Sequence, residues 1–352
     1  MPAILVLRLS SLGDVVLTSS FLQSAREHFP EAHLDFVVRD DLVPIATALP
    51  GLRRVVAVAR RAGPAALAQL GSALARENYM HVFDLHSSLR TRLLTWRLRR
   101  RLRPGFSKQE LPRWLLVHAH RDVYGSFGGV RPLRDRMLDP LRRLGHAPSL
   151  HDTHLVISQA ARARALECLG NGTDRVRVAV APGARWPSKR WPAQRFAALV
   201  ARLAATPATQ FVVLGENAEA PLAAAVARAA PQASLDLCGR LELLETAAVL
   251  QRCRLLITND SGLMHVAEAV GCPVLAIFGP TTPAFGYAPF LPASRLLHRP
   301  PACNPCSKNG SRPCHRPTHE CMENIGVEEV ATLAQGCLAA RPGVAVVSDR
   351  PI

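Results

Sequence analysis

The residues best suited to chemistry lie in residues 258–265, Thr-Asn-Asp-Ser-Gly-Leu-Met-His, between an apolar run and a helical pattern. At such a helix start, the free N–H groups of Ser261 and Gly262 and the positive end of the helix dipole attract anions. Gly262 also allows a phosphate to approach the backbone closely. Asp260 could accept hydrogen bonds from sugar hydroxyls, or it could only cap the helix. The segment therefore indicates a site for a phosphate-bearing ligand.

Two further loops offer cations and hydroxyl groups after apolar runs. Residues 182–192 contain a Gly turn with Lys189 and Arg190, and residues 278–283 read Phe-Gly-Pro-Thr-Thr-Pro, including Thr281. Cations, free N–H groups and hydroxyls in three such loops suit a diphosphate joined to a sugar. None of them is a Walker A loop or has the Gly-x-Gly-x-x-Gly spacing, which argues against an ATPase or a nicotinamide dehydrogenase.

Continuous apolar strands that alternate with helices must position these loops. We expect strands at residues 4–9, 34–38, 55–59, 82–85, 176–181, 211–214, 235–238, 255–258 and 274–278. This α/β pattern predicts two doubly wound, Rossmann-like parallel sheets that face each other across a cleft. The expected divisions are an N-terminal domain (1–160), a C-terminal domain (173–326) and a closing helix with a tail (327–352). Ligands bind outside the carboxyl ends of such strands, where the three loops lie.

Composition limits the class of protein. The chain has 352 residues, of which 48% are apolar, and its net charge is +16. An excess of positive charge indicates an anionic partner, such as nucleic acid, an acidic membrane surface or a phosphorylated substrate, or else reflects an arginine-rich composition. No cleavable signal or bilayer-spanning run is visible, and isolated cysteines suit a reducing compartment. We therefore expect a cytoplasmic protein.

Residues 4–18, 182–192, 258–265 and 271–281 together resemble glycosyltransferase family 9, the ADP-heptose:lipopolysaccharide heptosyltransferases. The pairing of Asn-Asp-Ser-Gly-x-x-His with Phe-Gly-Pro-Thr at this spacing is specific to the family. The resemblance covers nearly the whole chain and is weakest between residues 97 and 150. It implies a GT-B fold with an acceptor-binding N-terminal domain and a donor-binding C-terminal domain. It also implies an inverting transfer that needs no metal or other cofactor.

The resemblance assigns the catalytic roles to Asp14 and Lys189. Asp14 would deprotonate the acceptor hydroxyl, because a carboxylate with an ordinary pKa near ~4 is ionised at neutral pH. Without the family pattern, Asp14 would be interpreted only as a helix cap. Lys189 would stabilise the charge that develops on the departing diphosphate.

The donor-binding residues come from the C-terminal half. Asp260 would bind hydroxyls of the donor sugar, while Ser261 and Gly262 would contact the phosphates. Arg190 and Thr281 are further candidates for donor binding. Glu219 either binds the nucleoside ribose or is a solvated carboxylate.

The acceptor-binding candidates are Gly13, Arg60, Arg61 and Arg90, which follow predicted strands of the N-terminal half. They would hold an anionic, lipid-linked sugar at the inner membrane surface, where the protein could bind peripherally. His86 stands where the family often has Gln, and this departure weakens the assignment of the acceptor.

Four cysteines form a second constellation, Cys303-x₂-Cys306-x₇-Cys314-x₆-Cys321. A structural zinc ion and reduced thiols are the two alternatives, and disulfides are a third in a cytoplasmic protein. The spacing is not a standard zinc-finger one, and the chemistry does not require this metal.

Three other functions remain open at this point. The same scaffold could use another nucleotide sugar or a surface-polysaccharide acceptor. It could also be a sugar-nucleotide sensor without catalytic activity. The positive charge would suit a nucleic-acid binding protein, but the chain lacks a basic recognition helix or aromatic residues interleaved with basic ones, so we expect no nucleic-acid partner.

Overall fold

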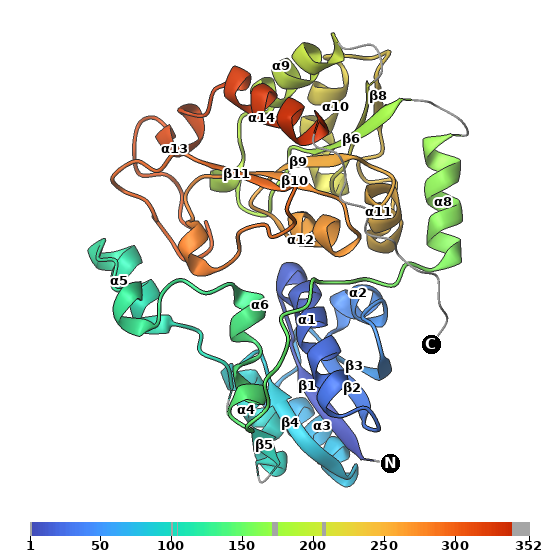
Figure 1. Cartoon of the computed structure of the whole chain (residues 1–352), viewed down its shortest axis with the longest axis vertical. Coiled ribbons are helices and arrows are strands. Elements are labelled where there is room, and N and C mark those ends of the chain that lie inside the picture. The colour runs from blue at the N-terminus through green and yellow to red at the C-terminus, as the bar shows by residue number, and fades with distance from the viewer. Residues whose placement is uncertain (1, 100, 104, 171–174, 206–208, 340–352) are drawn as a thin grey trace.

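The computed structural model describes residues 2–99, 101–103, 105–170, 175–205 and 209–339, which fold around two parallel sheets (Figure 1). The first sheet has the order β3-β2-β1-β4-β5 and the second has the order β11-β10-β9-β6-β7-β8. The first comprises β1 (Ala3–Leu7), β2 (His33–Arg39), β3 (Leu52–Val58), β4 (Tyr79–Asp84) and β5 (Leu102–Arg103). The second comprises β6 (Val176–Ala181), β7 (Thr209–Val213), β8 (Ser234–Asp236), β9 (Leu255–Asn259), β10 (Val274–Phe278) and β11 (Arg295–His298).

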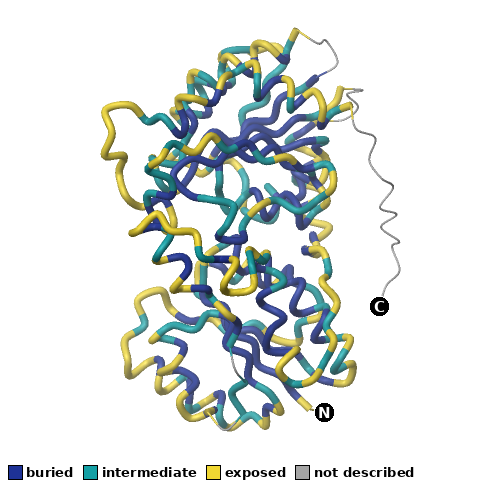
Figure 2. Tube along the Cα trace, turned by 60° about the vertical axis from the view of Figure 1, so that its left-hand side comes forward, coloured by how far each residue is buried: buried dark blue, intermediate teal, exposed yellow. Residues whose placement is uncertain are grey.

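Helices cover both faces of each sheet. Successive side chains of a central strand therefore enter two different apolar cores. In β1, Ile4 and Val6 join one core while Leu5 and Leu7 join another. Figure 2 shows the strands as buried trace inside more exposed helices and loops. A parallel sheet buried on both faces requires such continuous apolar strands. The predicted fold class of two doubly wound sheets is therefore confirmed.

The longer helices of the first half are α1 (Leu12–His28), α3 (Pro64–Arg76) and α5 (Glu110–Ala119). Shorter ones are α2 (Val43–Thr47), α4 (Leu89–Thr95), α6 (Leu133–Arg136) and α7 (Asp139–Arg142). The second half contains α8 (Gln159–Leu169), α9 (Ala193–Ala204), α10 (Ala220–Ala227), α11 (Leu243–Leu250), α12 (Gly262–Ala269), α13 (Glu320–Glu323) and α14 (Val327–Ala339). No helix among the described residues is long and apolar enough to cross a bilayer.

The predicted apolar stripe of α9 is buried on the second sheet through Phe196, Leu199, Val200 and Leu203. The closing helix α14 packs on the same side, against α9 and the strands β9 to β11. Residues 340–352 of the expected tail lie outside the described residues. Helix α8 packs against α11, so the chain has reached the second sheet by residue 159.

Both sheets reverse their direction of growth at one point, between β1 and β4 in the first and between β6 and β9 in the second. Connections leave the two neighbouring strands in opposite directions there, which opens a crevice at their carboxyl ends. Lys189 and Asp260 lie in the loops after β6 and β9, and Asp14 lies in the first turn of α1, directly after the loop that follows β1. The topology therefore concentrates the predicted site residues at two facing crevices.

Candidate active site

The first turns of α1 and α12 meet between the two sheets (Figure 1). A Cβ atom added at Gly13 would lie 2.4 Å from Cδ2 of His265. One added at Gly262 would lie 3.0 Å from Cδ2 of Leu12. The contact therefore requires glycine at position 13, and at position 262 a side chain would fit only if Leu12 moved slightly. For Gly13 the structure shows a packing role, and acceptor binding by this residue stays a prediction.

The carboxylate of Asp14 lies at the start of α1 and is almost completely buried. Its Oδ2 accepts hydrogen bonds from the backbone N–H and the Oγ of Ser11, both at 2.8 Å. Its Oδ1 forms an ion pair with Arg8 at 2.7 Å and accepts a bond from the Tyr287 hydroxyl at 3.2 Å. Asp14 thus caps its helix, as expected for the structural alternative, and also faces the second domain through Tyr287.

The electrostatic surroundings of Asp14 keep it ionised. Burial alone would raise the pKa of this carboxyl group, but the charge of Arg8 and the hydrogen bonds from Ser11 outweigh it and lower the pKa to about 2. The negative charge is therefore present at any physiological pH. A carboxylate in this state can accept a proton only in concert with bond formation, as general-base catalysis requires.

Lys189, Asp260 and Thr281 come together on the side of the second domain. The Nζ of Lys189 lies 2.5 Å from Oδ2 of Asp260, and the Thr281 hydroxyl donates to the same oxygen at 2.6 Å. Both charged side chains are largely buried, with exposures of 14% and 13%. Three loops that follow β6, β9 and β10 thus supply a cation, a carboxylate and a hydroxyl to one point.

Asn259 fixes the loop that carries Lys189. Its Nδ2 donates to the carbonyls of Pro182 and Gly183 at 2.9 and 3.1 Å, and its Oδ1 accepts from the N–H of Trp191 at 2.9 Å. Arg190 points back into this loop, where its Nε donates to the carbonyl of Ala184 at 2.9 Å. Arg190 thus helps to hold the loop, and its binding of the donor stays a prediction.

His265 lies close to the carboxylates of Asp14 and Asp260. It is buried, and this burial lowers its pKa to about 4 even though the charges of Asp260 and Asp14 act in the opposite direction. The imidazole is neutral at physiological pH, and its Nδ1 has no partner among the described residues. Its position beside Gly13 explains the histidine of the sequence pattern as a packing residue at the contact of the two domains.

The other donor candidates occupy the same edge of the second sheet. Ser261 is the N-terminal cap of α12, Gly262 is its first residue, and the Ser261 hydroxyl lies 3.4 Å from that of Thr258. The Glu219 carboxylate faces Gly183, where an added Cβ would lie 2.0 Å from Glu219 Oε1. Its Oε2 accepts the N–H of Glu216 at 3.0 Å. Glu219 is thus held against the loop after β6.

The three predicted acceptor arginines belong to a separate surface. Arg60 and Arg61 are exposed after β3. Arg90 donates to the carbonyls of Arg60 and Ala59 at 3.1 and 2.7 Å, so its guanidinium braces the loop that contains the other two. The structure brings these three residues together, but no hydrogen bond or ion pair joins them to Asp14.

The zinc alternative for the four cysteines is not supported. No three His, Cys, Asp or Glu side chains in the described parts of the chain are arranged to hold a metal ion. All nine cysteines are free. Cys303 and Cys306 have their sulfurs 3.9 Å apart, but Cys314 is exposed and Cys321 is buried in the core of the second domain. The four cysteines nevertheless line one small pocket, together with His319 and Glu320.

Sequence reasoning missed Arg8, Tyr287 and Asn259. A charged residue at the end of an apolar strand was a usable signal for Arg8, since Arg8 is buried and must find a partner. Asn259 lies inside the recognised pattern, but its role as a loop clamp depends on contacts 68 to 77 residues away. Tyr287 follows no pattern that would place it near Asp14.

Comparison with known proteins identifies the family of the chain. The model of glycosyltransferase family 9 (heptosyltransferase) matches residues 67–313. Lipooligosaccharide heptosyltransferase 2 of Haemophilus influenzae is 26% identical over 296 residues, covering 80% of this chain and 84% of its own. Lipopolysaccharide heptosyltransferase 1 of Pseudomonas aeruginosa is 27% identical over 370 aligned positions, covering 96% and 98%.

Solved structures show the same fold. A family 9 glycosyltransferase from Veillonella parvula superposes with a TM-score of 0.78 at 24% identity, covering 96% of this chain and 97% of its own. An Escherichia coli heptosyltransferase determined with ADP-2-deoxy-2-fluoro heptose gives 0.66 at 20% identity, covering 95% and 99%. The predicted GT-B architecture is confirmed. Because the family model matches more than half of the chain, this protein is a glycosyltransferase and belongs to glycosyltransferase family 9.

Proposed function

We propose that the protein transfers heptose from ADP-heptose to an anionic, lipid-linked sugar of the lipopolysaccharide inner core, with inversion at the anomeric carbon. The observation that carries this proposal is the position of Asp14 opposite the Lys189–Asp260 pair, across the contact between α1 and α12. A base on one domain and a cation on the other are what a single displacement needs. Heptosyltransferases among the relatives of the chain support the choice of sugar.

In the proposed reaction, Asp14 accepts the proton of the acceptor hydroxyl as its oxygen attacks the anomeric carbon of the donor. The bond between that carbon and the diphosphate oxygen breaks, and ADP carries away the electron pair. Attack from the face opposite the leaving group inverts the configuration. Lys189 stabilises the charge that grows on the diphosphate, where a fixed cation is most effective.

The donor lies along the carboxyl edge of the second sheet in this proposal. The free N–H groups at the start of α12 receive the diphosphate, since Ser261 and Gly262 begin that helix. Asp260 exchanges its bonds with Lys189 and Thr281 for bonds to sugar hydroxyls, and Glu219 binds the ribose. Lys189 and the N–H groups at the start of α12 supply the charge stabilisation, so we propose that transfer needs no metal.

Peripheral binding of the protein to the membrane surface would bring it to its proposed lipid-linked acceptor. Leu89, Leu93 and Trp96, on α4 and the 3₁₀ turn after it, are exposed by 80%, 37% and 61%. Leu111 and Trp114 of α5, which projects from the left side of the molecule in Figure 1, are exposed by 53% and 56%. Exposed aromatic and aliphatic side chains among arginines are typical of surfaces that bind anionic lipid interfaces.

The proposal is tested by incubating the protein with ADP-heptose and a panel of truncated lipopolysaccharide cores, followed by mass analysis of the products. A mass increase of one heptose on one core, with release of ADP, is the expected result. Transfer from a different nucleotide sugar, with none from ADP-heptose, would replace the donor in the proposal. Binding of ADP without transfer to any core would indicate a sensor instead of an enzyme.

A further inference from the structure

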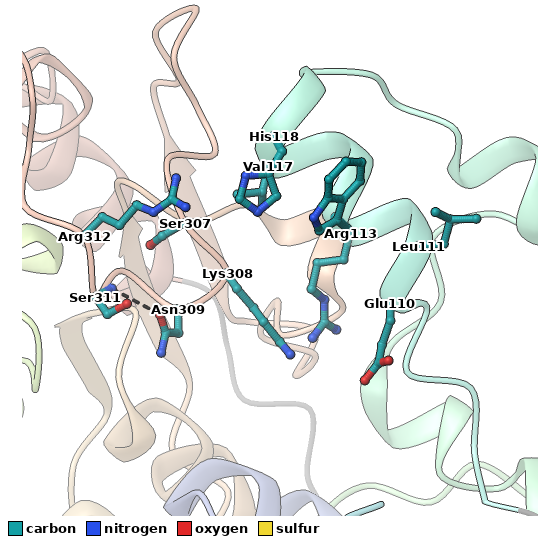
Figure 3. Close-up of a pocket in the computed structure, with 11 residues that line it drawn as sticks. Glu110, Leu111, Arg113, Val117, His118, Ser307, Lys308, Asn309, Ser311 and Arg312 are labelled. Carbon is teal, nitrogen blue, oxygen red and sulfur yellow. Dashed lines mark hydrogen bonds between the residues drawn. The ribbon is translucent and has the colours of Figure 1, made fainter. Parts of the chain in front are cut away.

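A cavity of about 570 Å³ lies between α5 and the loop that follows Cys306. Its first wall is formed by residues of α5 and its second by residues 307–312 (Figure 3). The volume is in the range of pockets that hold a sugar-sized ligand. None of the residues assigned above to the donor or to the base lines it.

Arg113 is the buried cation of this cavity. Its exposure is 7%, and its Nε has no hydrogen-bond partner. The guanidinium lies over the ring of Phe285, 5.2 Å from the ring centre, and it forms no ion pair with any described residue. A buried charge without a counter-charge is costly, so a site of this kind is completed by an anionic ligand.

Lys308 enters the cavity from the opposite wall. In Figure 3 the side chains of Arg113 and Lys308 extend from facing elements toward the same space. Partial burial and then the nearby charge of Arg113 lower the pKa of Lys308. Arg312 also lines the cavity, and the only acidic residue among the described lining residues is Glu110, which is exposed and forms no ion pair. Cations therefore outnumber acids in this cavity.

The cavity is close enough to the proposed base for their charges to interact. The charge of Asp14 acts on Lys308, and that of Arg113 acts on Tyr287, whose hydroxyl donates to Asp14. Arg136, which is fully buried, adds a second positive charge beside Arg113, and burial together with that neighbour lowers its pKa to about 10. This proximity is consistent with a single acceptor that reaches both the cavity and Asp14.

We propose that this cavity binds the acidic group, a carboxylate or phosphate monoester, of the acceptor sugar, held between Arg113 of α5 and Lys308 of the second domain. The inference rests on the proposed function, because it takes the ligand to be the acceptor of that reaction. It gives the cysteine-containing loop a role, since that loop carries Lys308 and Arg312. It also makes acceptor recognition a property of both domains.

The test compares wild type with Lys308→Glu, whose exposed side chain is outside the core. Initial rates are measured with deacylated core acceptors and with the same acceptors neutralised in one of two ways. Methyl esterification removes the charge of the carboxylates, and phosphatase treatment removes the phosphate monoesters, so the two samples distinguish carboxylate from phosphate. We expect Lys308→Glu to raise the KM of the acidic acceptor at least about tenfold, because an attractive contact becomes repulsive. With the neutralised acceptor, the variant and wild type should have equal KM values.

Arg316→Glu is the matched control, because it makes the same charge change in the same loop, on an exposed residue that does not line the cavity. Arg113→Gln provides a second variant, and it should also raise the KM of the acidic acceptor selectively. If Lys308→Glu raises the KM of acidic and neutralised acceptors equally, or behaves like Arg316→Glu, the proposal is wrong. An equal loss of ADP affinity would assign the cavity to the donor instead.

Calorimetric titration of the ADP-bound protein with the deacylated acidic core separates this proposal from the proposed function, because no transfer is possible with ADP. Binding that Lys308→Glu weakens about tenfold would support the cavity even if no heptose transfer were detected. Normal transfer that is unaffected by Lys308→Glu would leave the function intact and overturn the cavity. The absence of both binding and transfer would overturn both proposals.

Discussion

Arg8 and Asp14 form a buried ion pair of 2.7 Å between the end of β1 and the start of α1. Four hydrogen bonds or ion pairs reach this carboxylate, and the one from Tyr287 is the longest at 3.2 Å. Tyr287 belongs to the other domain. We therefore expect the acceptor hydroxyl to take the place of the Tyr287 hydroxyl on Oδ1, while Arg8 and Ser11 keep the carboxylate oriented.

Asp14→Asn should lower kcat by a factor of about 10² to 10⁴, the usual contribution of a general base. ADP binding, measured by calorimetry, should be unchanged, since the donor loops are on the other domain. The substitution leaves Arg8 without its counter-charge and should cost about 3 kcal/mol of stability, so rates must be measured well below Tm. Asp84→Asn is the control, because its Oδ1 accepts only backbone N–H groups, a role that an amide oxygen retains. Equal rates for Asp14→Asn and wild type would disprove the assignment of the base.

Lys189→Ala should reduce kcat/KM by about 10² to 10³, because the diphosphate loses its fixed cation and Asp260 loses its ion pair. Steady-state kinetics with ADP-heptose measures this loss. Arg190→Ala removes a neighbouring cation that donates to a loop carbonyl, and it should have a much smaller effect. The assignment to Lys189 fails if the two variants are equally impaired.

Most of the fold was predictable because buried parallel strands are continuous apolar runs with helices between them. All nine predicted strands are present within a few residues of their expected bounds. The short edge strands β5 and β11 were missed, since Leu102–Arg103 and Arg295–His298 contain few apolar residues. Helix α5 was missed, and its burial does not follow hydrophobicity, because Arg113 is buried while Leu111 and Trp114 are exposed.

Glu268 gives a prediction for the dependence of stability on pH. Burial raises the pKa of this carboxyl group to about 7, although hydrogen bonds from Leu291, Phe290 and Ser294 oppose the change. The folded protein keeps the proton that the unfolded chain loses near 4.5. The stability contribution is therefore complete below pH 4.5 and is lost as the pH rises through 7, a loss of about 3 kcal/mol.

Glu268→Gln, which resembles the protonated side chain, should remove this loss. Denaturant unfolding should show the variant to be more stable than wild type at pH 8 and similar to it at pH 4. A constant difference between the two proteins from pH 4 to pH 8 would contradict the prediction.

Chelation tests the proposal of metal-independent transfer. Incubation with excess EDTA, followed by an assay in metal-free buffer, should leave the transfer rate within about twofold of the untreated value, because Lys189 and the start of α12 supply the positive charge. Recovery of a lost rate by an added divalent cation would show that the proposal is wrong.

Membrane binding by the exposed apolar residues of α4 and the turn after it is testable by co-sedimentation with anionic phosphatidylglycerol vesicles. The double substitution Leu89→Ser and Trp96→Ser should weaken binding about tenfold, since both side chains lose apolar contact with lipid. Leu166→Ser on α8, also an exposed apolar residue, is the control and should bind like wild type. Equal binding of all three proteins would rule out this surface.

The candidate site was predictable only where a single segment carries the information. The loops after β6, β9 and β10 were identified because glycine, hydroxyl and charged residues follow buried strands. Arg113 and Lys308 were not identified, because they come from parts of the sequence 195 residues apart, and neither belongs to a recognisable pattern. These residues come together only through the tertiary packing of α5 against a distant loop, which the sequence alone does not reveal.

The close packing of Gly13 against His265 acts as a spacer between the two domains. It limits their approach through a backbone and a ring at the starts of two helices, away from the surface loops. In the proposed reaction, the separation of Asp14 and Lys189 therefore depends on this spacer and not on the loops proposed to hold the acceptor. Substitutions in those loops should change the acceptor without moving the two reacting groups.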